Sequence, residues 1–167
     1  KKKWPEKRPP YQGGGEMISE VSFEKTTFNE IPYKFEAGTP NITSVIAFGA
    51  AVDLLIKAGI SEIAAWENEL LEYATQKLKL INGLKIYGEA PKKSSVISFN
   101  IEGIHSYDLG MLLDKLGIAV RTGHHCADTV MQHFGIQGTV RISFGIYTTK
   151  EEIDIFLEAL NKVILMF

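Results

Sequence analysis

The residues best suited to chemistry lie in one short stretch, RTGHHCADTVMQHFG, at residues 121–135. It contains Cys126, the single cysteine of the chain, with His124 and His125 directly before it and Arg121 at its start. A free cysteine is often a buried and inert core residue, so packing alone is one explanation. Cationic neighbours, however, favour the thiolate, which is the nucleophilic form of cysteine. The stretch therefore leaves a choice between a structural residue, a nucleophile and a metal ligand.

Local backbone signals favour the nucleophile. A helix is predicted over residues 127–134 and closed by Gly135, so Cys126 falls at its cap, where free N–H groups and the helix dipole favour an anion. Gly123 permits the turn that exposes such a residue. Asp128, in the first helical turn, opposes a thiolate to some extent. This setting predicts a nucleophile or a sulfur carrier rather than a core residue.

A metal site is the main chemical alternative. Nitrogen and sulfur ligands are available from His124, His125, Cys126 and His133. Two adjacent histidines on a turn point in different directions, and the stretch has no CxxC or HxxxH pair to fix a tetrahedral site. A cysteine-protease pair has less support, since no partner Asn or Asp is indicated. We predict no metal here and keep zinc as the alternative.

A second candidate lies in the predicted strand TVRISFGIY, residues 139–147. Alternation puts one set of side chains on an apolar face: Val140, Ile142, Phe144 and Ile146. Arg141 and Ser143 then lie on the other face. Arg141 is either a solvated side chain or a guanidinium fork for a substrate carboxylate, because arginine binds such groups through two hydrogen bonds.

Two glycine-containing segments come earlier in the chain. EAGTPN places Gly38 and Thr39 at a predicted helix N-terminus, which is either an ordinary N-cap or a phosphate site. QGGGEM, at residues 12–17, lacks the Lys-Ser/Thr pair of a P-loop and has no preceding strand. We therefore exclude nucleotide binding at QGGGEM.

Predicted helices and strands alternate around these residues. After an irregular arm over residues 1–38, helices are predicted at residues 40–58, 61–81, 106–117, 127–134 and 149–164, and strands at residues 84–88, 94–102, 118–122 and 139–147. Thr39 is the predicted cap of the first helix, whose small residues predict a buried helix. Thr149 and Glu152 form a predicted capping box for the last helix. From about residue 82 the layout is a small sheet covered by helices, preceded by two long helices.

Composition limits the possible partners and compartments. The chain has 167 residues, 45% of them hydrophobic and 23% charged, which is typical of a globular domain. A net charge of -2 gives no electrostatic footprint for nucleic acid or an anionic membrane. The longest apolar segment, residues 45–56, is too short to span a bilayer. One cysteine makes no internal disulfide, so we expect a reducing compartment, the cytoplasm.

Four ordered segments resemble a known family. They read PPYQGGGEMI, KFEAGTPN, VRTGHHCA and R-x-S-x-x-x-Y-x-T, the last at residues 141–149. With them the chain resembles the later part of the Suf-type, group II cysteine desulfurases, also called selenocysteine lyase-like, in the class V aminotransferases. The resemblance implies the C-terminal part of an α/β fold type I transferase that uses pyridoxal 5'-phosphate (PLP). Residues 1–81 would end the large domain, with an interface arm and two helices, and residues 82–167 would form the small α/β domain.

The resemblance also implies roles for individual residues. Cys126 matches the nucleophile that takes sulfur from L-cysteine or selenium from L-selenocysteine. With L-cysteine the products are L-alanine and a persulfide on the enzyme. Arg141 matches the arginine that binds the substrate carboxylate, and Arg121 a second active-site arginine. Thr39, with Gly38, matches the site that reaches the PLP phosphate of the neighbouring subunit in a homodimer. A dedicated sulfur-acceptor protein and a role in iron-sulfur cluster assembly are implied as well.

One feature of the family is absent. Its Schiff-base lysine follows a Ser-x-His motif upstream of PPYQGGGEM, and no such motif occurs in this sequence. Lys1–Lys3 lie too close to that segment and lack the preceding histidine. The chain also starts in loop sequence without a methionine, so we expect a fragment that is inactive by itself. The alternative is a non-catalytic sulfur-carrier or interaction domain that retains the cysteine.

Overall fold

The computed structural model describes residues 6–167, so the predictions for Lys1–Lys3 lie outside the described residues. The chain divides into two compact units, the first ending at Lys57 and the second spanning Ala58–Phe167. Each unit is described by itself below.

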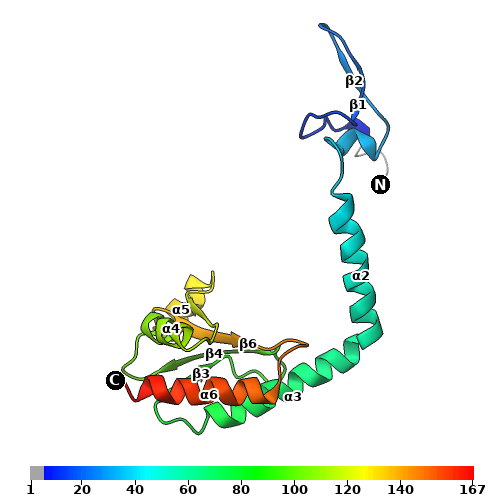
Figure 1. Cartoon of the computed structure of the whole chain (residues 1–167). Helices are drawn as coiled ribbons and strands as arrows, with labels where there is room; N and C mark the ends of the chain where they lie inside the picture. The colour runs from blue at the N-terminus through cyan, green and yellow to red at the C-terminus, as the bar shows by residue number, and fades with distance from the viewer. Residues whose placement is uncertain (1–5) are drawn as a thin grey trace. The chain divides into compact units, whose positions relative to one another are not determined.

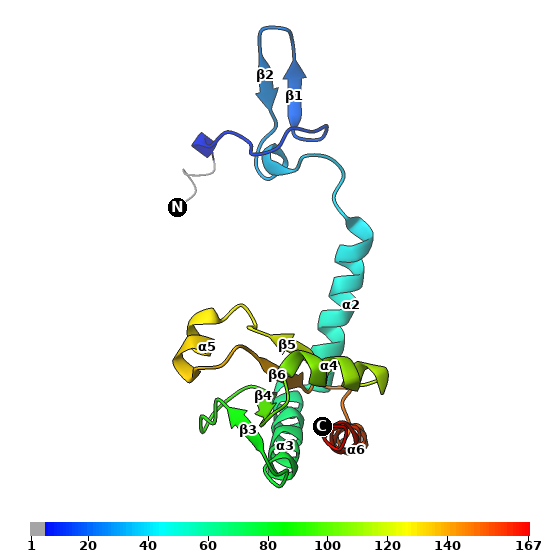
Figure 2. The same cartoon turned by 90° about the vertical axis from the view of Figure 1, so that its left-hand side faces the viewer.

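The second unit is a four-stranded antiparallel sheet with helices on its faces. The strand order is β3-β4-β6-β5, with bounds β3 Leu84–Tyr87, β4 Val96–Ile101, β5 Arg121–Gly123 and β6 Thr139–Ser143. The helices are α3 Ile60–Leu78, α4 Ser106–Lys115, α5 Asp128–Phe134 and α6 Lys150–Ile164. Helices α3, α4 and α6 lie on one side of the sheet and α5 on the other (Figures 1 and 2). The predicted small sheet covered by helices is confirmed.

The core of this unit follows from the alternation along the strands. Val140 and Ile142 of β6 are buried, as predicted, and so are Ile97, Phe99 and Ile101 of β4. Each such side chain contributes about 1.5–3 kcal/mol through burial. The intervening residues, Ser98 and Arg141 among them, lie on the opposite face of the sheet. One face thus makes the core, and the other is left for a site.

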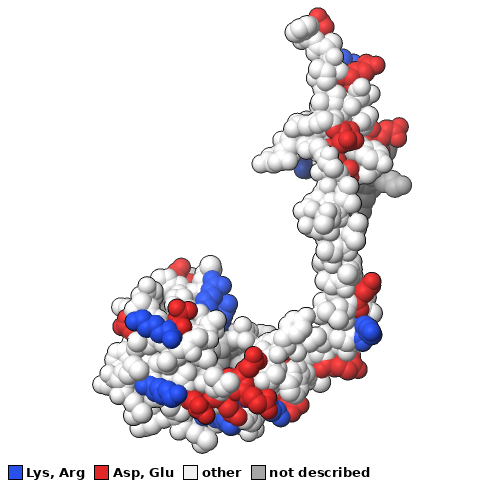
Figure 3. Space-filling model, viewed as in Figure 1, with Lys and Arg blue, Asp and Glu red and all other residues white. Residues whose placement is uncertain are grey.

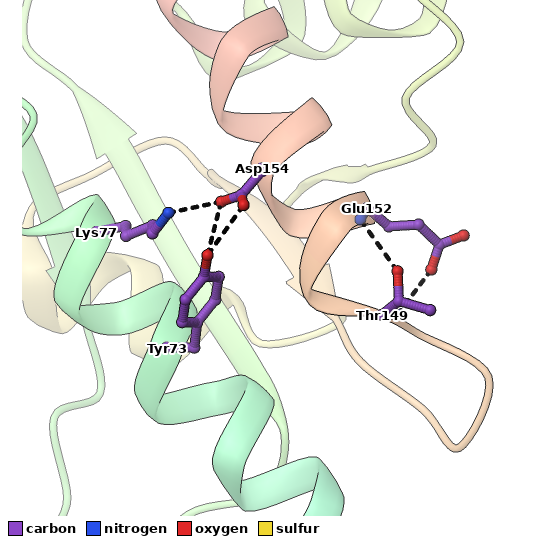
Figure 4. Close-up of polar contacts among 5 residues, drawn as sticks. All are labelled: Tyr73, Lys77, Thr149, Glu152 and Asp154. Carbon is purple, nitrogen blue, oxygen red and sulfur yellow. Dashed lines mark hydrogen bonds and ion pairs between the residues drawn. The ribbon is translucent and has the colours of Figure 1, made fainter.

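Helix α6 closes this core in the way the sequence predicted. Its inward residues are all buried: Ile153, Phe156, Leu160 and Val163. The capping box is present, with the Thr149 hydroxyl accepting from the Glu152 N–H at 3.2 Å and the Glu152 carboxylate accepting from the Thr149 N–H at 2.9 Å (Figure 4). Two free N–H groups at the helix start are satisfied in this way.

A polar contact joins α3 to α6 beside the core. The Tyr73 hydroxyl donates to the Asp154 carboxylate at 2.9 Å, and Lys77 Nζ donates to the same carboxylate at 2.7 Å (Figure 4). Figure 3 shows acidic and basic side chains mixed over this face of the second unit. Hydrogen bonds from Lys77 and then Tyr73 hold the pKa of Asp154 below its ordinary value.

This contact predicts a pH-dependent stability. A carboxyl with a lowered folded-state pKa stabilises the fold above its unfolded pKa, about 4, and loses that contribution as the pH falls through the folded pKa. Asp154→Asn should therefore lower the melting temperature at pH 7, and the difference from wild type should vanish in acid. The effect should be small, because the Lys77 and Asp154 side chains are 40% and 44% exposed. Glu158→Gln, an exposed change on α6, is the control, and an equal shift for both variants would contradict the prediction.

The first unit contains a hairpin and a long helix. Strands β1 Ile18–Val21 and β2 Thr26–Phe28 pair antiparallel, and a short 3₁₀ turn, η1, spans Tyr33–Phe35. The prediction of an irregular arm over residues 1–38 is therefore wrong for this part, where two short strands were missed because they lack a buried face. Helix α2 spans Ile42–Ala58.

Helix α2 differs from its prediction in two respects. It begins at Ile42, and the Asn41 side chain accepts from the Ser44 N–H at 3.2 Å, so Asn41 rather than Thr39 supplies the cap. The helix buries no residue, whereas its small side chains predicted close packing. Its large apolar side chains are exposed, including Ile42, Val45, Ile46, Phe48, Leu54 and Ile56, and Figure 3 shows much of its surface without charge. Small residues permit close packing but do not supply the partner.

Gly59 separates α2 from α3. It adopts a φ of 87°, which only glycine reaches without strain, and ends the first helix as predicted. Among the described residues, neither helix alone is long and apolar enough to cross a membrane, although the pair passes by length and composition if counted together. Helix α3 packs in the core of the second unit, so its apolar residues serve core packing.

The compact units divide the chain after Lys57, and the predicted domain boundary lies after residue 81. Helix α3 is part of the same compact unit as the sheet that follows it. The reason is its buried face of Leu70, Leu71, Ala74 and Leu78, which forms part of the second unit's core. The assignment of residues 1–81 to the end of a large PLP domain stays a prediction.

Candidate active site

Cys126 lies in the turn between β5 and α5, and its side chain is exposed. Both His125 and Cys126 have positive φ angles, 56° and 58°. Such a conformation costs a non-glycine residue roughly 1–2 kcal/mol, and two in succession are uncommon. Strained backbone of this kind concentrates at functional sites, where the surrounding structure holds it in place.

The positive charge near Cys126 comes from Arg121. Arg121 Nη2 donates to Cys126 Sγ at 3.9 Å. The predicted place of Cys126 at the helix cap is wrong by one residue, since Ala127 is the N-cap of the seven-residue helix α5. The Ala127 N–H bonds the His124 carbonyl oxygen at 2.9 Å and so does not point at the thiol as a free donor. The contact with the sulfur therefore comes from the guanidinium and not from the helix terminus.

The two histidines are turned to other partners. His125 Nε2 lies 2.9 Å from the Thr139 hydroxyl and 3.1 Å from the Thr139 carbonyl oxygen. Burial lowers the pKa of His125, and the charges of Arg141 and Arg121 lower it further, which disfavours a positive charge on this ring. His124 Nδ1 contacts the Asp128 carboxylate at 2.9 Å.

This arrangement also bears on the zinc alternative. The four candidate ligands of residues 124–133 do not converge, because the His125 ring faces Thr139 and the His124 ring faces Asp128. Within residues 6–167, no three His, Cys, Asp or Glu side chains are grouped so that they could hold a metal ion.

Arg121 and Arg141 lie side by side on the open face of the sheet. They are register partners between β5 and β6, and Ser98 is the partner of Arg141 on β4. In the described part of the chain, no carboxylate forms an ion pair with either arginine. Like charges directly opposite each other destabilise a sheet unless an anion lies between or above them. The pair therefore offers two positive charges close to the thiol, unpaired among the described residues, which suit an anionic group.

The structure thus brings together three of the predicted site residues, namely Cys126, Arg121 and Arg141. It adds Thr139, which sequence reasoning treated only as the start of a strand. Thr139 is 1% exposed, and its hydroxyl is the contact of the His125 ring. A threonine at a strand end carries no sequence signal for such a contact, because the contact depends on the β5–β6 register.

Gly38 and Thr39 belong to the first unit. Gly38 has a φ of 108°, and no atom lies within 4 Å of the position that a Cβ would take. Thr39 is exposed, and α2 begins three residues later. A hydroxyl and an open backbone near the start of a long helix fit the oxygens of a phosphate group.

The triple glycine of QGGGEM supports this loop. A Cβ on Gly14 would lie 2.7 Å from the carbonyl carbon of Ala37, so only glycine allows the approach. The glycine segment thus packs against EAGTPN. Sequence reasoning excluded the P-loop but did not find this support.

Comparison of the sequence with known proteins identifies a family and relatives that match over most of the chain. The sequence model of the family described as "Aminotransferase class-V" matches residues 1–156. A "Probable cysteine desulfurase" of Xylella fastidiosa (strain Temecula1) is 52% identical over 155 residues, which cover 93% of this chain and 37% of that protein. A "Cysteine desulfurase" of Wigglesworthia glossinidia brevipalpis is 47% identical over 164 residues, covering 98% of this chain and 40% of that protein.

Solved structures agree with the sequence matches. The crystal structure of the cysteine desulfurase CsdA (S-sulfonic acid) from Escherichia coli superposes with a TM-score of 0.82 and 34% identity. The match covers 95% of this chain and 39% of that chain. This chain therefore spans about two fifths of the length of the proteins it resembles.

Proposed function

This chain belongs to the class V aminotransferase family, and we propose that it supplies the persulfide-forming part of a cysteine desulfurase that uses PLP. The observation that carries the proposal is the exposed Cys126 thiol 3.9 Å from Arg121, with Arg141 paired opposite Arg121 on the same sheet face. A nucleophile and an anion site lie next to each other, which suits a substrate that carries both sulfur and a carboxylate.

The arginine pair would bind and orient the substrate. Arg141 would hold the carboxylate of L-cysteine through two charge-assisted hydrogen bonds. Arg121 would hold the Cys126 side chain in place by donating to Sγ. The Arg141 guanidinium would thus bind the substrate, and the Arg121 guanidinium would contact the nucleophile.

The sulfur transfer follows from this placement. The Cys126 thiolate attacks the substrate sulfur, so that an S–S bond forms while the substrate C–S bond breaks. PLP, when bound, supplies the electron sink that accepts the electron pair of the broken bond until the carbon is protonated to L-alanine. Cys126 is left as a persulfide.

The first unit would serve the cofactor. Gly38 and Thr39 fit the phosphate of PLP through the open backbone and the threonine hydroxyl. We propose that they do so for the neighbouring subunit of a homodimer. The covalent lysine is not supplied by any Ser-x-His-Lys motif of this sequence.

The persulfide needs a recipient. Cys126 is exposed on a turn, so a sulfur-acceptor protein can approach it and take the sulfur, for use in iron-sulfur cluster assembly. We propose a reducing compartment, the cytoplasm, because a thiolate nucleophile must stay reduced between turnovers. Selenocysteine is a second substrate of the same chemistry, since selenium can be attacked in place of sulfur.

The deciding experiment uses the complete enzyme that contains this segment. Incubation with L-cysteine should yield L-alanine, and the peptide with Cys126 should gain the mass of one sulfur atom before reductant is added. A protein that takes up sulfur from a persulfide donor but releases no alanine would instead be a non-catalytic sulfur carrier, and the desulfurase proposal would be wrong.

A further prediction concerns the 167-residue chain by itself. With PLP and borohydride it should show no stoichiometric covalent cofactor, because the sequence has no lysine in the family's motif. Mass spectrometry after reduction measures this directly. Stoichiometric incorporation at one lysine would contradict the prediction, and scattered incorporation at several exposed lysines is the expected background.

A further inference from the structure

His125 is next to Cys126 in the sequence, yet its side chain reaches a different part of the molecule. Its Nε2 contacts both oxygens of Thr139, the first residue of β6. Thr139 is buried and pairs with Gly123, the last residue of β5. The imidazole therefore ties the turn that leaves β5 to the buried start of the neighbouring strand.

The partners of the ring define its protonation. A carbonyl oxygen only accepts, so the contact with Thr139 assigns the proton of the neutral ring to Nε2. Nδ1 is buried and has no hydrogen-bond partner among the described residues. A proton on Nδ1 would bury a charged N–H without an acceptor, which is unfavourable. The ring is thus a neutral anchor and neither a source of charge nor an acid.

The turn needs such an anchor. His125 and Cys126 both have left-handed backbone angles, and α5 has no side-chain cap at Ala127. The Cys126 side chain is exposed, and His124 contacts Asp128 of the same segment. Among the described side chains of residues 124–127, His125 is the one that contacts β6, while Cys126 accepts from Arg121 of β5.

We propose that His125 is a positioning residue, whose contact with Thr139 fixes the left-handed turn and thereby holds the Cys126 thiol beside Arg121. The inference deepens the proposed desulfurase function and rests on it for its kinetic test. His125 does not touch Sγ or the substrate site in this account, and acts only through the backbone that it shares with Cys126.

Kinetics of the complete enzyme test the anchor. His125→Ala should lower kcat about 10- to 100-fold, because a small misplacement of a nucleophile has effects of that size. KM for L-cysteine should hardly change, since Arg141 is untouched. His125→Gln offers an N–H donor at a similar reach and should recover most of kcat. His133→Ala, which removes an exposed imidazole from α5, should behave as wild type.

Two kinetic results would overturn the proposal. One is a wild-type kcat in His125→Ala. The other is a His125→Gln enzyme as impaired as His125→Ala, because the imidazole would then be required for something other than a hydrogen bond to Thr139. If His125→Ala fails to fold in a melting scan, Thr139→Val takes its place, with a smaller loss of kcat expected and an unchanged kcat counting against the proposal.

Hydrogen exchange gives a test that does not need turnover. Amides of residues 121–128 should exchange faster in His125→Ala than in wild type and at the wild-type rate in His125→Gln. Unchanged exchange in His125→Ala would overturn the anchor. If the complete wild-type enzyme releases no alanine, the proposed function fails, and this measurement still decides whether His125 holds the turn.

Discussion

Replacing Cys126 with serine should nearly abolish sulfur transfer in the complete enzyme, lowering the rate of alanine formation by on the order of a thousandfold or more. A serine hydroxyl is a far weaker nucleophile than a thiol at neutral pH, and no second cysteine is present in this sequence to replace it. The persulfide on the 121–135 peptide should disappear as well. Alanine is measured by chromatography and the persulfide by peptide mass.

Substrate binding should survive this change. Arg141 lies on β6 and its side chain is unchanged in this variant, so the carboxylate contact proposed for it remains. The cofactor's visible absorption should therefore still change when L-cysteine is added to Cys126→Ser. Wild-type rates in the variant would exclude the nucleophile role. Equimolar zinc that resists chelation in wild type and is lost in Cys126→Ser would instead support the metal alternative.

The parts of the fold that sequence reasoning predicted are those determined by local pattern. The capping box of Thr149 and Glu152 requires only four neighbouring residues, and the alternation around Arg141 requires one strand. Gly135 closes α5 in a left-handed conformation, again a local property. These features are confirmed because nothing distant in the chain competes with them.

The parts that sequence reasoning did not predict depend on distant neighbours. The apolar spacing of helix α3 shows that it has a buried face but not that the sheet following it covers that face. The burial predicted for α2 failed for the same reason.

In the candidate site, too, features set by local sequence could be predicted and features that depend on distant residues could not. Cys126 and the two arginines were found from residue type and spacing, and their proximity is a consequence of the β5–β6 register that places Arg121 opposite Arg141. The role of His125 could not be found in this way. Its sequence position suggested a charge beside the thiol, whereas burial against Thr139 makes it a neutral anchor.

Replacing Arg141 with alanine should lower kcat/KM for L-cysteine about ten- to a hundredfold, which corresponds to a loss of roughly 1.5–3 kcal/mol for a charge-assisted pair of hydrogen bonds. Lysine at this position should recover only part of the loss, because an ammonium group cannot reproduce the planar fork. Steady-state kinetics of the complete enzyme, followed through alanine formation, provide the measurement.

Stability separates this role from a structural one. Arg141 has no carboxylate partner among the described residues and lies directly opposite Arg121, so its removal relieves a like-charge contact. The melting temperature of Arg141→Ala should therefore stay the same or rise slightly while kcat/KM falls. Lys85→Ala is the matched control, since it removes a positive charge from β3 on the same sheet face, and its kcat/KM should equal that of wild type. If Arg141→Ala unfolds the protein while the folded fraction keeps normal kcat/KM, the arginine supports the sheet, and the carboxylate must be bound elsewhere.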